Sequence, residues 1–477
     1  MSGRGRGAGQ GAAGFISISL KGLRVRIGGK GILNGIDFSL NENLSIGIVG
    51  ESGSGKTMFA RSLTGLLPAG SRAAGEYLID GRAAAPGAKE RDWRRIRGRE
   101  IGLIMQDPFT ALDPLGKCGA QILSGVPKEK RASFDLEKAL AEVGLPASAA
   151  ARYPFELSGG MRQRVVIAAA LATEPRLLIA DEATTALDVV TQKEILDLID
   201  EVRARRGMPL IMIAHDINLV YERTDRILVF HGGEVVESGP AREVIEHPKN
   251  DYTKLLTRAD RVLNQAAYPV YARAGRPILS VSGLTKRFGE QAALDGVSIC
   301  IREGECVGVV GESGSGKTTL ARCIVSLTRA DEGSVRYFGA GSPQIVFQDP
   351  YSSLNPAHTV RYILEEALAA GGRPKSELDE VLRLAELPRE FLDRKPESLS
   401  GGQRQRIAIA RAFAPRPELI LCDESVSALD LVVQNQILET IEKLRRERNL
   451  AVLFITHDLS VVRMLASRIY VMREGKV

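Results

Sequence analysis

The chain has 477 residues, a length typical of two to four domains, and 44% of its residues are hydrophobic. Its 64 basic and 58 acidic residues leave a net charge of +6, but both signs are mixed along the chain and aromatic residues make up only 5%. This pattern disfavours nucleic acid as a partner and favours a solvated surface that can lie near anionic lipid. The five cysteines form no CxxC pair and have no histidine at metal-ligand spacing, so we expect reduced thiols and no metal cluster.

The N-terminal segment, 1–14, is rich in glycine and carries Arg4 and Arg6. It has no clear apolar core of a signal peptide, and no stretch of the chain approaches 18 consecutive apolar residues. We therefore expect a disordered tail followed by a cytoplasmic protein.

An expected strand over Ser45–Val49 leads into the sequence Gly-Glu-Ser-Gly-Ser-Gly-Lys-Thr at Gly50–Thr57. The same eight residues recur at Gly311–Thr318, after an expected strand over Cys306–Val310. This is a P-loop, in which glycines let backbone N–H groups curl around phosphates, the lysine reaches the β- and γ-phosphates and the threonine binds Mg²⁺. Two identical copies predict two nucleotide sites. The predicted phosphate-binding residues are Gly50, Ser52, Gly53, Ser54, Gly55, Lys56 and Thr57, and Gly311, Ser313, Gly314, Ser315, Gly316, Lys317, Thr318 and Thr319.

The repeat extends far beyond the two P-loops. Four further matches are offset by 242 residues, whereas the P-loops are offset by 261. The difference falls in the first half, where a basic insertion spans Arg82–Arg99, and we expect this insertion at the surface. The four matches pair Gln106 with Gln348, Leu157–Gly160 with Leu399–Gly402, Asp181–Glu182 with Asp423–Glu424, and His215 with His457.

Short apolar segments precede the acidic pairs and the histidines. Leu177–Ala180 and Leu419–Cys422 are apolar on both faces, as buried strands of a parallel sheet are, and Leu210–Ala214 and Ala451–Thr456 repeat the pattern. Reactive groups are thus expected at the carboxyl ends of strands, where open α/β sheets bind ligands. The sequence predicts an α/β fold with two tandem domains, each a mainly parallel sheet with helices.

Phosphoryl transfer to water needs charge neutralisation, a metal, a positioned water and a base. Taken alone, an Asp-Glu pair after a strand is usually a solvated helix start, but order, spacing and duplication together favour function. We expect Asp181 to hold the metal and Glu182 to orient or deprotonate the water, while His215 donates to the γ-phosphate and Gln106 senses metal and water. The predicted catalytic residues are Glu182, His215, Glu424 and His457, and the predicted metal-binding residues are Thr57, Gln106, Asp181, Thr318, Gln348 and Asp423.

The two Leu-Ser-Gly-Gly segments need a separate role, because each P-loop already completes the phosphate site of its own half. Each precedes an expected helix, over Arg162–Ala172 or Arg404–Ala412, whose N-terminus offers free N–H groups and a positive dipole to an anion. A second phosphate-binding surface in each half indicates two halves that face each other. Its residues are Ser158, Gly159 and Gly160, and Ser400, Gly401, Gly402 and Gln403.

The order and spacing of these motifs resemble a tandem ATP-binding subunit of the ATP-binding cassette superfamily, over nearly everything from Phe15 to Val477. In that family the halves pack head to tail, so each ATP lies between the P-loop of one half and the Leu-Ser-Gly-Gly signature of the other. The resemblance implies ATP and Mg²⁺ as ligands, a helical subdomain that carries the signature, and a D-loop role for Asp188 and Asp430. It also implies that an aromatic residue stacks on adenine. Phe288, 23 residues before Gly311, fits this role, whereas Ile27 stands at the matching place before Gly50.

The domain boundaries expected from the repeat are a tail over 1–14, a first cassette over 15–256, a linker over 257–277 and a second cassette over 278–477. The end of the chain, Val477, matches Val235, while the first half continues through Glu237–Leu256. Either the chain lacks a usual C-terminal segment, or the second domain ends early.

A narrower resemblance lies in the Gln-Asp-Pro stretches. Met105–Pro114 and Phe347–Pro356 look like those in the ATPases of bacterial dipeptide, oligopeptide and nickel importers, and this chain looks like two such ATPases fused. The resemblance implies two integral-membrane permease subunits, indirectly an extracytoplasmic solute-binding protein, and a peripheral place at the cytoplasmic face of the bacterial inner membrane. The cysteine cluster that many members carry is not matched, so an iron–sulfur cluster is not expected.

Two other classes remain alternatives. Soluble tandem cassettes that act on ribosomes also lack membrane spans, but they usually have a long charged helical linker, whereas 257–277 is short. Double ATPases of sugar importers typically have one degraded site, whereas both acidic pairs here are intact. In the importers that this chain resembles, the separate subunits select the transported solute.

Overall fold

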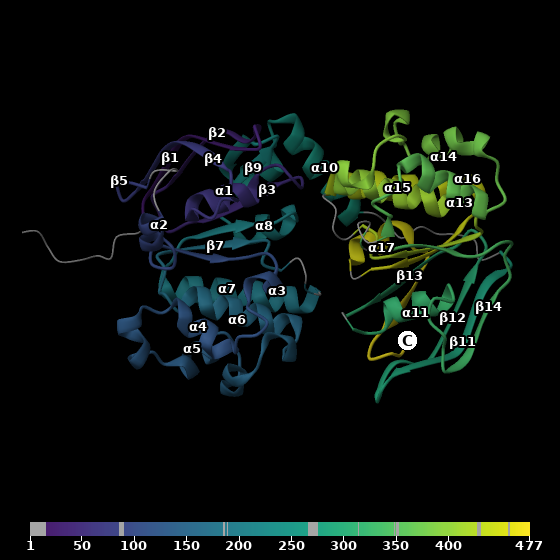
Figure 1. The fold of residues 1–477 in the computed structure, drawn as a ribbon, viewed down its shortest axis with the longest axis horizontal. Coiled ribbons are helices and arrows are strands. Elements are labelled where there is room, and N and C mark those ends of the chain that lie inside the picture. The colour runs from purple at the N-terminus through teal and green to yellow at the C-terminus, as the bar shows by residue number, and fades with distance from the viewer. Residues whose placement is uncertain are drawn as a thin grey trace, which may run out of the picture. The chain divides into compact units, whose positions relative to one another are not determined.

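The computed structural model describes residues 16–84, 90–184, 187, 189–265, 275–312, 314–347, 349, 353–426, 431–456 and 458–477. The chain divides into two compact units, with the boundary between Thr257 and Arg258 (Figure 1). Each unit combines one mainly or wholly parallel sheet, one antiparallel sheet and helices, so the predicted α/β class is confirmed.

The main sheet of the first unit has the strand order β10-β9-β3-β8-β7-β6, and only β9 and β10 pair antiparallel. Alternate residues of its central strands enter different cores. Ile179 and Ile211 pack with Phe59 of α1, while Leu178 and Leu210 belong to the cluster that includes α6 and α7. The same helices flank the sheet on opposite sides in Figure 1. Burial on both faces explains why these strands are continuously apolar. The strands are β3 (Ser45–Gly50), β6 (Ile101–Ile104), β7 (Leu177–Asp181), β8 (Leu210–Ile213), β9 (Arg226–His231) and β10 (Glu234–Pro240).

A separate antiparallel sheet, β2-β1-β4-β5, covers the α1 side of the first unit, and the sequence analysis did not predict it. Its hairpin turns at Gly28 and Gly29, which have φ angles of 56° and 84°. Two positive φ angles in a two-residue turn suit the twist of the flanking strands, and glycine adopts them without strain. The strands are β1 (Ile18–Ile27), β2 (Lys30–Leu40), β4 (Arg72–Ile79) and β5 (Arg82–Ala83).

The helices of the first unit include a helical region between β6 and β7. That region comprises α3 (Pro108–Ala111), α4 (Cys118–Gly125), η1 (Lys128–Ser133), α5 (Leu136–Glu142), η2 (Ala147–Ala151), η3 (Pro154–Glu156) and α6 (Gly159–Leu171). The others are α1 (Lys56–Thr64), α2 (Glu90–Ile96), α7 (Val189–Arg206), α8 (Ile217–Arg223), α9 (Ala241–Glu246) and α10 (Asp251–Gln265). The expected linker over 257–277 therefore begins within a helix.

The second unit repeats this plan. Its main sheet, β15-β16-β17-β13-β18, is parallel throughout, and its antiparallel sheet has the order β12-β11-β14. The strands are β11 (Pro277–Phe288), β12 (Gln291–Arg302), β13 (Cys306–Gly311), β14 (Glu332–Tyr337), β15 (Gln344–Val346), β16 (Leu419–Asp423), β17 (Ala451–Ile455) and β18 (Arg468–Met472). The six strands predicted from apolar segments in the two halves all form, each to within one residue of the expected end.

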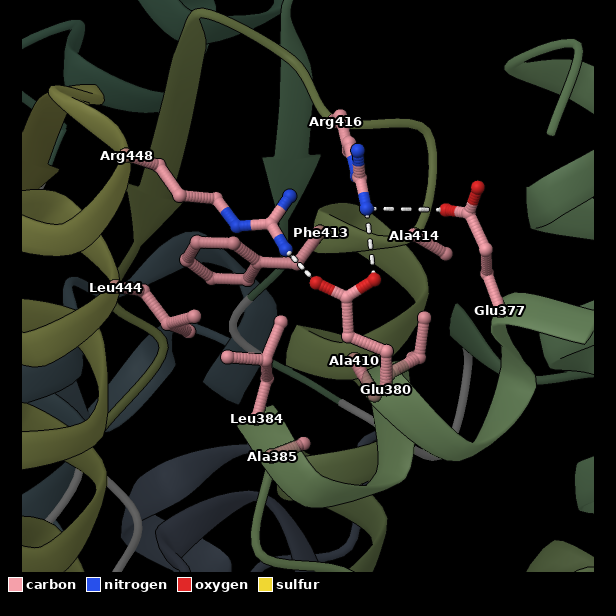
Figure 2. A pocket seen from close by; sticks show the side chains of 11 residues that line it. Glu377, Glu380, Leu384, Ala385, Ala410, Phe413, Ala414, Arg416, Leu444 and Arg448 are labelled. Carbon is pink, nitrogen blue, oxygen red and sulfur yellow. Dashed lines mark hydrogen bonds and ion pairs between the residues drawn. The ribbon is translucent and has the colours of Figure 1, made fainter.

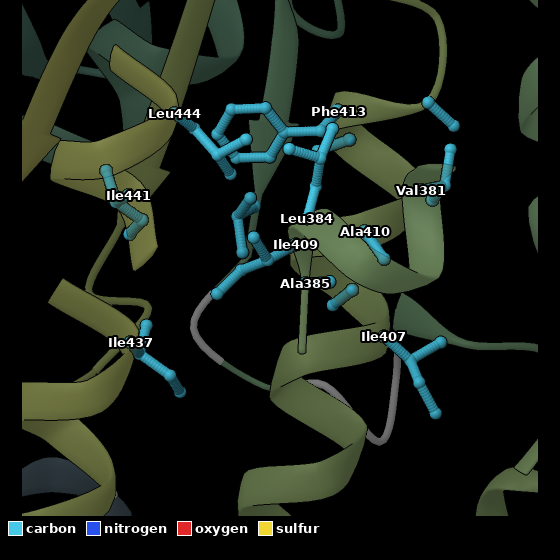
Figure 3. Close-up of a cluster of buried hydrophobic side chains, with 14 of the residues drawn as sticks. Val381, Leu384, Ala385, Ile407, Ile409, Ala410, Phe413, Ile437, Ile441 and Leu444 are labelled. Atoms are coloured by element: carbon cyan, nitrogen blue, oxygen red, sulfur yellow. The ribbon is translucent and has the colours of Figure 1, made fainter. Parts of the chain in front are cut away.

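The helical core of the second unit joins α14, α15 and α16. Figure 3 shows Leu384, Phe413 and Leu444 from these three helices directed toward one another, and all three are buried. The helices are α11 (Lys317–Ile324), α13 (Val360–Ala370), η4 (Lys375–Glu377), α14 (Leu378–Leu384), η5 (Arg389–Phe391), η6 (Pro396–Ser398), α15 (Gly401–Phe413), α16 (Leu431–Arg448) and α17 (Leu459–Leu465). Among the described residues, no helix has the length and apolar character needed to cross a bilayer.

The basic insertion Arg82–Arg99 is largely exposed where it is described, but the expectation of a surface position is wrong for Trp93. Its ring is 5% exposed and lies 6.1 Å from that of Tyr77, centroid to centroid. A Cβ at Gly65 would come within 2.1 Å of the indole, so glycine leaves room for it. The insertion is thus anchored in the core by one large apolar side chain.

Candidate active sites

The first P-loop follows β3 directly, and its glycines allow close backbone approaches. A Cβ at Gly50 would lie 2.1 Å from the carbonyl oxygen of Phe230, and one at Gly55 would lie 2.6 Å from Leu33 Cδ2. Gly53 and Gly55 also have positive φ angles, 83° and 104°. Ser52 and Gly53 are exposed, so the tip of the loop is open to a ligand.

A buried lysine begins the helix after each P-loop. Lys56 is 4% exposed, and its Nζ donates to the carbonyl oxygens of Gly50 at 2.7 Å and Glu51 at 2.8 Å. Lys317 makes the equivalent bonds to Gly311 and Glu312 at the same two distances. Each loop therefore encloses a positive charge, as a phosphate-binding loop requires.

Each P-loop also contains a buried serine hydroxyl with no hydrogen-bond partner among the described residues. These are the Oγ atoms of Ser54, which is 1% exposed, and Ser315, which is 3% exposed. Buried polar groups are normally satisfied, and an unsatisfied one at a loop of this type fits a loop completed by a ligand. The loop residues thus fit a nucleotide phosphate.

The threonine after each lysine meets the aspartate at the end of a neighbouring strand. Thr57 Oγ1 donates to Asp181 Oδ1 at 3.2 Å, and Thr318 Oγ1 donates to Asp423 Oδ1 at 3.3 Å. Burial, with the adjacent Glu182 carboxylate, raises the pKa of Asp181 to about 6, and burial likewise raises the pKa of Asp423. Hard oxygen donors of this kind suit Mg²⁺. The described residues contain no group of three or more His, Cys, Asp and Glu side chains that could hold a metal alone, so phosphates and water would complete the coordination.

The predicted catalytic glutamates stand at strained backbone positions. Glu182 and Glu424 have φ angles of 48° and 47°. The Glu182 N–H donates to the Ile213 carbonyl oxygen at 3.0 Å, and the Glu424 N–H donates to the Ile455 carbonyl oxygen at 2.8 Å. A left-handed conformation in a residue other than glycine costs about 1–3 kcal/mol and is typical of functional sites. Gln106 Nε2 donates to Glu182 Oε2 at 2.7 Å, so the structure brings these two predicted residues together.

Sheet order brings the other predicted residues of the first site to the same edge. Strand β8 lies between β3 and β7, and β6 lies beyond β7. The P-loop, His215, Asp181 and Gln106 therefore follow the carboxyl ends of four adjacent parallel strands. His215 is half-buried there.

The two residues predicted to meet adenine differ in exposure. Phe288 ends β11 and is 57% exposed, with Lys286 Nζ 5.5 Å from its ring centroid, so it is not a core residue. Ile27 ends β1 and is partly buried against the core of the first unit. The structure thus leaves Phe288 accessible to a base.

The signature serines cap the helices that follow them. Ser158 Oγ accepts the N–H of Met161, and Ser400 Oγ accepts that of Gln403, both at 3.3 Å. Gln403 Oε1 also accepts the Ser400 N–H at 3.0 Å, which completes a capping box in the second unit.

The glycines of the signatures have packing roles in the structure. A Cβ at Gly160 would lie 2.6 Å from Thr191 Cγ2, and one at Gly402 would lie 2.7 Å from Val433 Cγ1. Gly159 and Gly401 begin α6 and α15, and Thr319 is half-buried in the first turn of α11. Ser313, Gln348, His457, Asp188 and Asp430 lie outside the described residues.

Sequence reasoning missed Tyr252 and His231, which contact the first P-loop. Tyr252 Oη accepts the N–H of Glu51 at 2.8 Å, and His231 Nδ1 lies 2.9 Å from Glu51 Oε1. Tyr252 is 201 residues from Glu51, and no local sequence signal connects them.

One pocket in the second unit lies apart from these motifs, between α14, α15 and α16 (Figure 2). Its floor is apolar, and the charged groups of its rim pair with one another. Arg416 Nη2 lies 2.7 Å from Glu380 Oε2 and 3.3 Å from Glu377 Oε2. No P-loop or signature residue lines it, so it is not part of the nucleotide sites.

Comparisons with known proteins agree with this geometry. The sequence profile of a family described as ABC transporter matches residues 33–185 and 294–427. The chain is 39% identical to the peptidoglycan transport ATP-binding protein YejF of Agrobacterium fabrum, over 93% of this chain and 87% of that protein. It is 36% identical to the glutathione import ATP-binding protein GsiA of Salmonella choleraesuis, over 96% of this chain and 85% of that protein.

Among solved structures, the archaeal ribosome recycling factor aABCE1, in complex with the ribosomal stalk protein aP1, has a similar fold. The TM-score is 0.65 and the identity 20%, over 91% of this chain and 84% of that chain. At that identity the likeness concerns the fold alone.

Proposed function

This chain belongs to the ABC transporter family, and on that premise we propose that it is the ATP-hydrolysing subunit of a bacterial importer for peptides or related small solutes. The observation that carries the proposal is its identity of 35–39% to import and transport ATP-binding proteins over at least 93% of its length. The motif residues described in both halves keep the same local contacts, which supports two working sites over one degraded site.

In the proposed reaction, the P-loop and Lys56 hold the ATP phosphates while Glu182 accepts a proton from the attacking water. The water oxygen forms a bond to the γ-phosphorus, and the bond from that phosphorus to the β–γ bridging oxygen breaks, giving ADP and phosphate. Thr57 and Asp181 would hold Mg²⁺, which would supply neutralisation of the phosphate charge. Gln106 fixes the Glu182 carboxylate through its 2.7 Å bond, and His215 donates to the γ-phosphate.

The second half repeats these roles with Lys317, Thr318, Asp423 and Glu424, and with Gln348 and His457. The signature segments Ser158–Gly160 and Ser400–Gly402 are proposed to supply phosphate ligands to the ATP held by the other half. We also propose D-loop roles for Asp188 and Asp430.

We further propose two membrane permease subunits as partners, with a solute-binding protein acting on the far side of the membrane, and a peripheral position at the cytoplasmic face. The proposed contacts for the permeases are the stretches Gln106–Pro114 and Gln348–Pro356. The first stretch leads to Leu115, which is 84% exposed, and Gln106 itself bonds the proposed catalytic glutamate. A partner at this stretch could therefore reach the base of the hydrolysis reaction through one side chain.

Cross-linking in native membranes tests the proposal. A cysteine at Thr110, which is exposed, should capture membrane permeases, whereas a cysteine at exposed Glu76 on β4 and the parent chain should not. Capture of ribosomal proteins at Thr110 would support the ribosome-associated class instead.

A further inference from the structure

Glu51, the second residue of the first P-loop, is held by side chains from two later elements. Its N–H donates to Tyr252 Oη of α10 at 2.8 Å, and its Oε1 lies 2.9 Å from Nδ1 of His231, which ends β9. The rings of Tyr252 and His231 pack against each other, with centroids 4.1 Å apart. Because the Glu51 carbonyl accepts from Lys56 Nζ, the residue is fixed at its N–H, its carboxylate and its carbonyl.

A chain of hydrogen bonds places Tyr252 at this position. The carboxylate of Glu237, in β10, accepts the backbone N–H groups of Lys249 at 2.9 Å and Asn250 at 3.0 Å. Asn250 Oδ1 then accepts the N–H of Tyr252 at 2.8 Å, at the start of α10. The first turn of α10 is therefore tied to the main sheet, and the phenol oxygen reaches the P-loop from a fixed base.

We propose that Tyr252 and His231 are positioning residues for the first ATP site, which hold Glu51 so that the P-loop is preformed for phosphate. The inference rests on the proposed role of Gly50–Thr57 in binding ATP. A loop with three glycines has many accessible conformations. When a ligand binds only one of them, its apparent affinity equals the intrinsic affinity multiplied by the fraction of molecules in that conformation. Fixing the residue at the start of the loop raises that fraction.

The second P-loop provides an internal comparison. Lys317 bonds the Glu312 carbonyl at 2.8 Å, as Lys56 bonds that of Glu51. The lysine contact is common to both loops, and the contacts of Tyr252 and His231 are made to the first, so the proposed effect of Tyr252→Phe is expected at the first site.

The test is ATP binding by the full chain with one site disabled at a time. Lys317→Ala confines binding to the first site, and Lys56→Ala confines it to the second. In the Lys317→Ala chain, Tyr252→Phe removes the phenol oxygen but keeps the aromatic ring that packs against His231. This substitution should weaken ATP binding about fivefold, the scale of one lost hydrogen bond. In the Lys56→Ala chain, the same substitution should leave the affinity unchanged.

A matched control is Tyr221→Phe, which removes a hydrogen bond of 2.9 Å from the phenol to Glu246 Oε1 and not to a P-loop residue, and it should not alter ATP affinity. A positioning role also predicts a kinetic split. Relative to the Lys317→Ala chain, the chain that also carries Tyr252→Phe should need about fivefold more ATP for half-maximal turnover. Its turnover at saturating ATP should stay within about twofold, because Glu182 is unchanged.

The outcomes separate this inference from the proposed site. Equal affinity of the Tyr252→Phe and parent chains at the first site would overturn the positioning role alone, even if Tyr252→Phe lowered the melting temperature. If the parent chain itself bound no ATP, the proposed nucleotide sites would be overturned, and the positioning role with them.

Discussion

The two P-loops share their reactive contacts and differ in their supports. In each unit the lysine Nζ lies 2.7 Å and 2.8 Å from the carbonyl oxygens of the first two residues of its own P-loop. The hydrogen bond from threonine to aspartate is 3.2 Å long in the first unit and 3.3 Å in the second. The surrounding residues differ. Ile27 and Met161 of the first unit stand where the second unit has Phe288 and Gln403, and Tyr252 contacts the first P-loop.

This difference shows which features the proposed chemistry constrains. A phosphate, a metal and a water need charges and oxygens at set positions, so those residues recur with the same geometry. Base stacking and loop support each contribute about 1 kcal/mol to nucleotide binding, and capping contributes a similar amount to helix stability. Different side chains can supply each of these contributions. The two sites are therefore expected to share a reaction and to differ in affinity and local stability.

The largest expected effect comes from the glutamates that follow the buried aspartates. Glu182→Gln and Glu424→Gln should each leave ATP binding intact while lowering turnover at their own site by about 10²–10⁴-fold, the scale of a positioned proton acceptor. Steady-state ATPase assays with nucleotide titrations measure both quantities. Full activity in the double variant would contradict the assignment, and unequal single variants would show that the sites contribute differently.

The next effect concerns stability, because burial and the Glu182 carboxylate raise the pKa of Asp181 to about 6 from an ordinary value of 3.8. The folded chain then binds a proton more tightly than the unfolded chain, so this aspartate costs stability progressively as pH rises from about 4 to 6. Asp181→Asn removes the charge. Without nucleotide and Mg²⁺ at pH 7.5, it should raise the free energy of unfolding by about 2 kcal/mol. Calorimetry should show the gain shrinking toward pH 4.

Asp80 is the control of opposite sign. Burial opposes its ionisation, but hydrogen bonds and charge from Arg176 lower its pKa overall. Asp80→Asn should therefore reduce stability at neutral pH, and the loss should diminish as pH falls through the lowered pKa. A fall in stability for Asp181→Asn at pH 7.5 would contradict the cost assigned to its buried charge.

The sequence predicted the parts of the fold that repeat a strong local pattern. Strands such as Leu177–Asp181 are apolar up to the polar motif at their end, so their positions could be predicted. The antiparallel sheets were missed, although the Gly28-Gly29 pair between alternating segments was a usable signal. The Tyr252–Glu51 contact had none, because it depends on how α10 packs after 201 residues of chain.

A smaller effect should separate the sites by their contact with adenine. Phe288 is exposed and accessible to a base, whereas Ile27 offers only apolar contact, so we expect affinities that differ by about fivefold, the low end for stacking on an aromatic. Phe288→Ala should weaken only the second site, and Ile27→Tyr should strengthen the first. Titrations in the Lys56→Ala and Lys317→Ala chains measure each site. Equal affinities that neither substitution moves would show that neither position meets the base.

The smallest effect tests whether Gln403 serves the helix or the nucleotide. Its side chain accepts the Ser400 N–H at 3.0 Å, a bond that Met161 cannot make in the first unit. Gln403→Met should therefore cost about 0.5 kcal/mol and Met161→Gln should gain a similar amount, because each removes or builds half of a capping box. For units of this size, that is a shift of about 1–2 °C in the melting temperature, in opposite directions. If Gln403 only caps α15, ATP affinity should be unchanged in both variants. A loss of affinity in Gln403→Met without a change in melting temperature would assign the side chain to the nucleotide, as the sequence first suggested.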